Sequence, residues 1–166
     1  MSWDVRPART TDIRAISALV TPLVEQRVLL GKDLVVLFES VQEFVVAVTA
    51  TDEVIGCGAL HVFWEDLGEI RTLTVAPEFQ HRGIGRALLG ALEAKARELG
   101  LRRLFCLSFE EAFFERNGFA HHDDTLVDAV VYGELVRSPD EGIAEFLDLA
   151  RVKPNTLGNA RLVKTL

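Results

Sequence analysis

The sequence LTVAPEFQHRGIGRALL, residues 73–89, passes from a β-rich run through a short loop into a helix that two glycines open. The first turn of a helix leaves four backbone N–H groups without partners, and the helix dipole adds partial positive charge there. Because Gly83 and Gly85 carry no Cβ, a phosphate can approach this backbone closely. Arg82 and Arg86 flank the turn and can add charge-assisted hydrogen bonds. The stretch therefore predicts an anion site at the start of a helix.

A glycine pair at a helix start is weak evidence by itself, because other phosphate-binding loops and simple tight turns also use glycine. A Rossmann fingerprint in this register needs a third glycine at position 88, where Leu88 stands. A Walker loop needs Gly-Lys followed by Ser or Thr, and that triplet is absent. Neither common nucleotide-binding loop fits this segment.

Hydrophobic periodicity outside this stretch predicts a chain of mixed strands and helices. The expected strands are 5–8, 44–48, 54–63, 69–75, 102–108, 144–152 and 161–166. The expected helices are 13–24, 34–41, 83–99 and 110–117, while 126–136 fits either type. Hairpins come first and a strand–helix–strand unit follows, so we expect an α/β sheet with antiparallel and parallel pairs.

Composition narrows the class of protein. The chain has 166 residues, and we expect residues 1–166 to form a single domain. A net charge of −7 disfavours nucleic acid as a partner. No apolar run of eighteen residues and no leader-like start are present, so we expect no membrane contact and a cytoplasmic protein. Cys57 and Cys106 make no metal-binding spacing, and no metal is expected.

Two motifs in this order resemble the GCN5-related N-acetyltransferase (GNAT) family. Gln80-x-x-Gly83-x-Gly85, after a strand ending Leu73-Thr74-Val75-x-Pro77, is similar to that family's pyrophosphate-binding motif. Phe113-Phe114-x-x-x-Gly118-Phe119 is similar to its next segment. The resemblance implies a GNAT fold, with a mixed, mostly antiparallel central sheet that is flanked by helices and splayed at two central parallel strands.

The resemblance also implies acetyl-coenzyme A as co-substrate. In this family pantetheine pairs with the free edge of the strand that matches residues 70–75, and the following loop and helix start hold the phosphates. The residues expected at the coenzyme are Leu73, Thr74, Val75, Gln80, His81, Arg82, Gly83, Ile84, Gly85 and Arg86.

Acetyl transfer to an amine needs a base for the amine and a proton for the departing thiolate. Glu69, at the start of the strand expected to carry the thioester, is our preferred base, although it could equally be a solvated charge. His61 is a second candidate. Many family members carry a tyrosine acid near the position of Phe114, which this chain lacks. Ser108 is the substitute to test, and its alternative role is a cap on the following helix.

A closer resemblance is to amino-acid N-acetyltransferases of the stand-alone N-acetylglutamate synthase type. It lies in Gly68-Glu69-Ile70-Arg71-x-Leu73-x-Val75, Phe105-x-Leu107-Ser108 and the tail Lys153-Pro154-Asn155-x-Leu157-Gly158-Asn159-x-Arg161. It implies L-glutamate or L-glutamine as acceptor, in the first step of arginine biosynthesis. It also implies Glu69 as base, Ser108 as acid, and Lys32 and Arg161 as the cations for the acceptor's carboxylates.

The chemistry of carboxylate binding adds one candidate residue for the acceptor site, and two alternative functions stay open. Arginine binds carboxylates in bidentate fashion, so Arg71 is a further candidate for the acceptor's carboxylate. A general acetyltransferase of polyamines, drugs or protein N-termini stays open, as does a coenzyme A-binding module without turnover. Homodimers are common in the family, and no residue of this sequence decides the oligomeric state.

Overall fold

The computed structural model describes residues 2–124, 126–147 and 159–166. Its centre is a seven-stranded sheet in the order β1-β2-β3-β4-β5-β7-β6. The strands are β1 (Trp3–Pro7), β2 (Phe44–Thr49), β3 (Val54–Val62), β4 (Leu67–Val75), β5 (Arg103–Ser108), β6 (Ala120–His121) and β7 (Ala160–Thr165). All neighbouring pairs are antiparallel except β4 and β5, which run parallel. The predicted mixed, mostly antiparallel sheet is confirmed.

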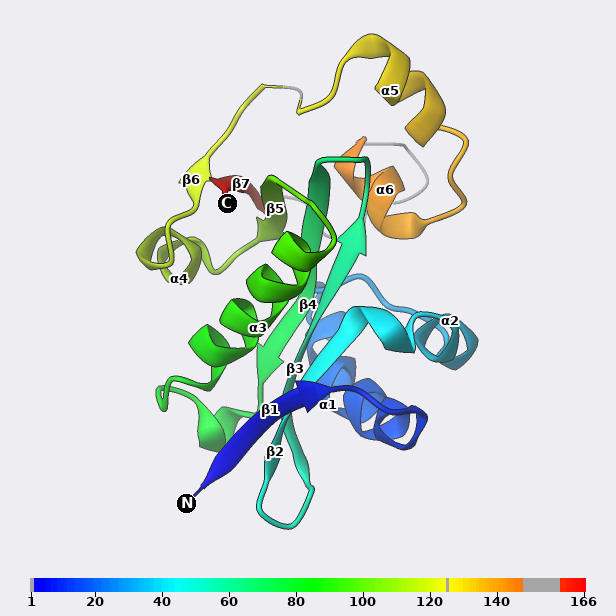
Figure 1. Cartoon of the computed structure of the whole chain (residues 1–166). Helices are drawn as coiled ribbons and strands as arrows, with labels where there is room; N and C mark the ends of the chain where they lie inside the picture. The colour runs from blue at the N-terminus through cyan, green and yellow to red at the C-terminus, as the bar shows by residue number, and fades with distance from the viewer. Residues whose placement is uncertain (1, 125, 148–158) are drawn as a thin grey trace.

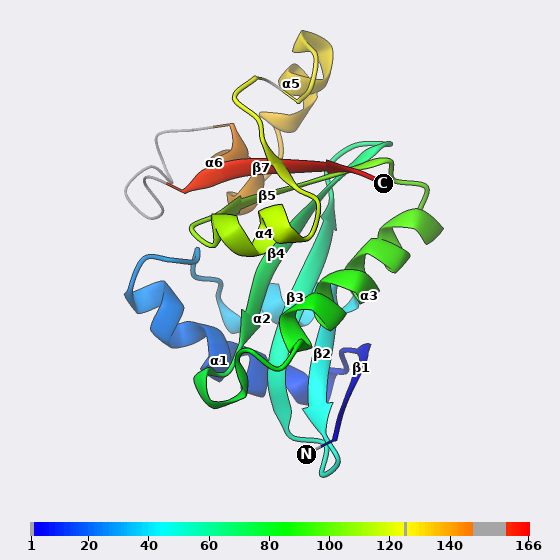
Figure 2. The same cartoon turned by 90° about the vertical axis from the view of Figure 1, so that its left-hand side faces the viewer.

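Helices cover both faces of the sheet (Figures 1 and 2). On one face lies α3 (Ile84–Glu98); on the other lie α1 (Ile13–Glu25) and α2 (Leu34–Glu39). Strand β2 shows why both faces are filled. Val45 and Ala47 pack in the cluster that includes α3, whereas Val46 and Val48 pack in the cluster that includes α1. A strand buried on both faces appears in sequence as a continuous apolar run.

The helix patterns recognised in the sequence form as expected. Leu88 and Leu92, one turn apart on α3, are fully buried, and Gly100 with its positive φ follows the end of this helix. Pro22 lies within α1, which nevertheless continues to Glu25. Four further short helical elements are η1 (Thr10–Asp12), η2 (Val41–Glu43), η3 (Pro77–Phe79) and α4 (Glu111–Arg116).

Two short helices, α5 (Ala129–Leu135) and α6 (Glu141–Phe146), pack beyond the end of the sheet (Figure 1). The ambiguous segment 126–136 is thus helical where α5 forms. The predicted strand 144–152 is wrong at its start, because residues 144–146 belong to α6; residues 148–152 lie outside the described residues. Asp140 decides this by accepting a hydrogen bond from the Ile143 amide as a helix N-cap.

Strands β4 and β5 separate soon after they pair. Their parallel register covers only three pairs, which end at Glu69 opposite Phe105. Figure 2 shows the two strands diverging from there, with β7 beside β5. The predicted splay of the two central parallel strands is confirmed. None of the described helices is both long and apolar enough to cross a membrane.

Candidate active site

The separation of β4 from β5 leaves one edge of β4 open. Residues 70–75 are joined to β3 on one side, and no described strand pairs with them on the other. Leu73 and Val75 pack against the core under α3 with their side chains. The backbone groups of Leu73 and the N–H of Val75 lie on the open side, where an extended ligand can pair with them, whereas the Val75 carbonyl oxygen accepts from the Gln80 side chain.

A β-bulge interrupts β4 within this open segment. The register with β3 shifts between Cys57 and Ala59, and Thr72 has a φ of 55°. The Cys57 thiol donates a hydrogen bond to the Thr72 carbonyl oxygen at 3.5 Å. A bulge places an extra residue in one strand and turns its backbone groups away from the regular ladder. The strand therefore bends where it leaves β5.

The loop from Gln80 to Gly83 leads into the first turn of α3. His81 and Gly83 have positive φ angles of 61° and 81°, and a side chain at 83 would meet no neighbour within 4 Å. The Gln80 amide donates to the Val75 carbonyl oxygen at 3.2 Å, and an Arg82 nitrogen donates to the Glu78 carbonyl oxygen at 3.1 Å. These bonds fix the loop that precedes the unpaired amides of the helix.

The first turn of α3 itself contains Ile84, Gly85 and Arg86. Ile84 is buried in the core, whereas Arg86 is exposed. A Cβ at Gly85 would lie 3.3 Å from the Phe113 ring, so this glycine allows the aromatic side chain of α4 to pack closely. The predicted coenzyme residues thus form one continuous strip from β4 to α3.

A small hollow opens to solvent where β4 leaves β5, with a volume of about 50 Å³. Its walls come from β4, β5, α6 and the loop between α1 and α2. The lining residues are Val28, Leu29, Leu30, Lys32, Glu69, Ile70, Arg71, Thr72, Leu107, Gly142 and Glu145. The structure therefore brings together three of the predicted site residues: Lys32, Glu69 and Arg71.

Glu69 is a buried carboxylate, with 5% of its surface exposed. Burial raises its pKa, and the neighbouring Arg71 guanidinium opposes that rise. Arg71 is 7% exposed, and its Nε donates to a Glu69 carboxylate oxygen. Because both side chains leave the same face of β4 two residues apart, the strand itself imposes this pairing.

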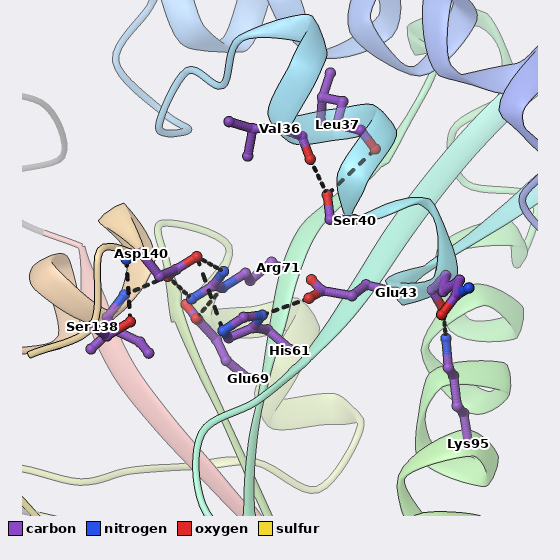
Figure 3. Close-up of polar contacts among 12 residues, drawn as sticks. Val36, Leu37, Ser40, Glu43, His61, Glu69, Arg71, Lys95, Ser138 and Asp140 are labelled. Carbon is purple, nitrogen blue, oxygen red and sulfur yellow. Dashed lines mark hydrogen bonds and ion pairs between the residues drawn. The ribbon is translucent and has the colours of Figure 1, made fainter. Parts of the chain in front are cut away.

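Arg71 is also held from α6. Its Nη1 and Nη2 donate to the two carboxylate oxygens of Asp140 at 3.0 and 2.5 Å (Figure 3). Burial raises the pKa of Asp140, but hydrogen bonds from Arg71 outweigh this and hold it below its usual range. The guanidinium predicted for the acceptor's carboxylate is thus engaged by two carboxylates of the protein itself.

His61 extends this group of charges toward the surface. It lies opposite Glu69 in the β3–β4 register, but its Nδ1 is 2.7 Å from a Glu43 carboxylate oxygen, and its Nε2 is 4.0 Å from Asp140. Figure 3 shows Glu43, His61 and Asp140 in a row that leads to Arg71. Both ring nitrogens of His61 therefore face carboxylates of the protein, not the hollow where an acceptor amine would bind.

Lys32 lies in the loop that closes the hollow on the side of α1 and α2. Burial lowers its pKa, and the charge of Arg71 lowers it further. Among the described residues, no hydrogen bond or ion pair of its ammonium group is found. A half-buried cation of this kind can bind an anion that enters the hollow.

Ser108 and Arg161 do not line this hollow. The Ser108 hydroxyl oxygen accepts a hydrogen bond from the Glu110 amide at 2.9 Å, so it caps the turn before α4. Arg161 donates from one nitrogen to the Phe146 carbonyl oxygen at 2.7 Å and lies over the Phe146 ring. Residues 153–158 of the tail motif lie outside the described residues.

Three residues near Glu69 were missed in the sequence: Asp140, Gly142 and Glu145. The segment Ser138-Pro139-Asp140 before an apolar run is a helix-start signal that would have located α6. Nothing local in the sequence shows that Asp140 reaches Arg71, since the two lie 69 positions apart. The described residues include no group of three or more His, Cys, Asp or Glu arranged to hold a metal.

The chain is similar to known proteins in sequence and in fold. The family model described as "Acetyltransferase (GNAT) family" matches residues 20–119. The "Amino-acid acetyltransferase" of Mycobacterium tuberculosis is 51% identical over 164 residues, which cover 98% of this chain and 94% of that protein. A crystal structure from M. tuberculosis in complex with CoA and NLQ superposes with a TM-score of 0.93 at 51% identity, covering 98% and 99% of the two chains.

A more distant neighbour is longer than this chain. N-acetylglutamate synthase from Neisseria gonorrhoeae, complexed with coenzyme A and N-acetyl-glutamate, superposes with a TM-score of 0.79 at 30% identity. That match covers all of this chain and 35% of the Neisseria chain. The match to the family model, the splayed sheet and the agreement along nearly the full chain lead to one assignment. This chain belongs to the acetyltransferase (GNAT) family and is an acetyltransferase that uses acetyl-coenzyme A.

Proposed function

We propose that this protein, as a single domain over residues 1–166, transfers the acetyl group of acetyl-coenzyme A to the α-amine of L-glutamate or L-glutamine. In this proposal it catalyses the first step of arginine biosynthesis. The observation that carries it is the buried Glu69 carboxylate beside the half-buried Lys32, at the point where β4 leaves β5. The amino-acid acetyltransferase of M. tuberculosis and the Neisseria synthase support the choice of acceptor.

The coenzyme occupies the strip from β4 to α3. Pantetheine pairs with the open edge at Leu73, Thr74 and Val75, and the pyrophosphate meets the amides of residues 81–86. With the pyrophosphate at the start of α3, the pantetheine arm runs back along β4 from Val75. The thioester then lies near the bulge at Thr72 and toward Glu69. Arg82 and Arg86 supply charge outside the helix start.

Glu69 acts as the general base. A raised pKa brings a carboxylate closer to the basicity that proton abstraction from an ammonium group needs. The free amine then attacks the thioester carbonyl carbon, the carbon–sulfur bond breaks, and coenzyme A leaves as a thiolate. Ser108 donates the proton to that sulfur, and the second proton lost by the adduct's nitrogen replaces it on the Ser108 oxygen. That oxygen accepts from the Glu110 amide, which leaves the O–H free to donate.

Lys32 and Arg161 bind the acceptor's carboxylates. Lys32 is placed for this by its position in the wall of the hollow. Arg161 lies on β7 opposite Leu107, which does line the hollow. The Nε, Nη1 and Nη2 atoms of Arg71 donate to Glu69 and Asp140, so this guanidinium is not part of the proposed acceptor site.

We expect wild-type protein to acetylate glutamate or glutamine and to reject their decarboxylated amines and spermidine. A buried cation that faces no carboxylate is left unpaired, which penalises the wrong acceptor by desolvation. Initial rates of thiol release, measured for each amine, give the kcat/KM values to compare. Equal kcat/KM for the decarboxylated amines or spermidine would favour the general-amine alternative.

Replacing Lys32 or Arg161 should raise the KM for the amino acid and leave the KM for acetyl-coenzyme A nearly unchanged. The loss of a charge-assisted contact corresponds to about 10- to 100-fold in affinity. The matched control for Lys32→Met is Lys95→Met, because the Lys95 ammonium donates to the Gln42 carbonyl oxygen and neither residue lines the hollow. Figure 3 shows Lys95 apart from Glu69 and Arg71. Equal effects of the two lysine variants would remove Lys32 from the acceptor site.

A further inference from the structure

The N-terminal turn of α6 lies directly over the guanidinium of Arg71. Asp140, the N-cap of this helix, accepts from Nη1 and Nη2 and also from the Ile143 amide at 2.8 Å. One carboxylate therefore ties the start of α6 to the strand that carries Glu69 (Figure 3). The guanidinium also lies 5.5 Å from the Phe63 ring centre, which limits its movement on that side.

Gly142 gives the guanidinium its room. A Cβ at this position would lie 2.5 Å from Arg71 Cζ and 2.9 Å from Nε, both too close for any real contact. Gly142 does not have the positive φ that would otherwise call for glycine. Glycine is unfavourable inside a helix, by about 1 kcal/mol relative to alanine. Its presence here is explained by the packing of α6 against Arg71.

Arg71 passes this restraint on to Glu69. Its Nε donates to Glu69 while its other end is fixed by Asp140, so the planar guanidinium sets the direction of the carboxylate. The titratable and charged groups around Glu69 are Arg71 on the same strand, His61 on β3, Cys106 on β5, Asp140 at the N-cap of α6, Glu145 within that helix, and Lys32 in the α1–α2 loop. Arg71 makes the direct contact among them.

We propose that Arg71, Asp140 and Gly142 form a clamp through which α6 positions Glu69 for catalysis. The inference rests on the proposed role of Glu69 as base. Arg71 and Asp140 are positioning residues in this account, and Gly142 is the site at which α6 fits around the guanidinium. The clamp fixes the position of the base. Its loss should therefore lower kcat and leave the affinity for acetyl-coenzyme A nearly unchanged.

The test compares Gly142→Ala with Gly133→Ala. Both replace a helical glycine by alanine, but a Cβ at 133 in α5 meets nothing within 4 Å. We expect Gly142→Ala to lower kcat about 100-fold, the effect of misplacing a catalytic group by roughly 1 Å, with the KM for acetyl-coenzyme A nearly unchanged. Gly133→Ala should behave as wild type. Circular dichroism and thermal melting establish that both variants fold.

Two further readouts separate positioning from general stability. In Gly142→Ala the acidic limb of the kcat/KM profile should move to higher pH, because Arg71 no longer favours the ionised Glu69. In Asp140→Asn it should move to lower pH, because a negative charge is removed and the guanidinium remains. The Nε–H resonance of Arg71 in ¹⁵N-labelled protein should shift or vanish in both variants and persist in Gly133→Ala.

Wild-type kcat and an unmoved pH profile in Gly142→Ala would overturn the clamp. Equal losses in Gly142→Ala and Gly133→Ala would do so too. The assays use whichever amine the wild-type protein acetylates, so an unexpected acceptor contradicts the proposed function and leaves the comparison of variants intact. If no amine is acetylated, the proposed function fails, and the Arg71 resonance alone decides whether the contact between α6 and Arg71 exists in solution.

Discussion

Glu69→Gln should lower kcat by about 10²- to 10⁴-fold, the usual contribution of a general base. The amide keeps the shape of the side chain and can still accept from Arg71, but it cannot take a proton from the amine. Because burial raises the pKa of Glu69, wild-type activity should fall as the pH drops through that raised value. The variant should lack this limb and recover partly at high pH, where more of the acceptor is already a free amine.

Steady-state rates across pH, together with calorimetric titration of coenzyme A, test this expectation. Coenzyme A affinity should stay close to that of wild type, since Glu69 is not among the residues proposed to bind the coenzyme, 73–75 and 80–86. Glu145→Gln is the matched comparison, because Glu145 is a second carboxylate in the wall of the same hollow. Full turnover by Glu69→Gln at neutral pH would assign Glu69 a structural role.

Gly83→Asp should weaken coenzyme A binding by about 100-fold or more, since like charges brought together cost several kcal/mol. The new carboxylate would stand at the N-terminus of α3, where the proposal places the pyrophosphate. A side chain there meets no neighbour within 4 Å, so the fold has room for it. Aspartate also tolerates the positive φ of 81° better than most residues do.

Gly83→Asn is the control, because asparagine matches aspartate in size and in tolerance of positive φ but carries no charge. We expect calorimetry to give it an affinity between those of wild type and Gly83→Asp. Similar affinities for wild type and Gly83→Asp would contradict the placement of the phosphates. Similar losses in both variants would attribute the effect to bulk rather than charge.

The part of the fold around the glycine pair could be predicted from local signals. The run before Pro77, the two glycines and the apolar spacing of Leu88 and Leu92 each indicate one element. The separation of β4 from β5 could not be predicted from local signals, since no residue spacing shows where two parallel strands separate. Its prediction rested on the family resemblance.

The C-terminal third could not be predicted as well. Residues 144–152 alternate enough to suggest a strand, yet Asp140 starts a helix and the Phe146 ring packs against Phe63 and Phe105. The capping aspartate was the available signal. The engagement of Arg71 was beyond local analysis, because a carboxylate from a distant helix supplies its partners. The sequence showed an arginine near Glu69, but not what it binds.

The position of β7 in the sheet has a consequence for how the chain folds. Strands β2, β3 and β4 follow one another through short turns and pair as antiparallel neighbours, so this part of the sheet consists largely of local contacts. Strand β7 instead enters between β5 and β6, and its pairing with β5 closes a loop of about fifty residues. Non-local pairing of this kind has high contact order and forms slowly. The half of the molecule that carries Ser108 and Arg161 should therefore be the last to reach its native topology.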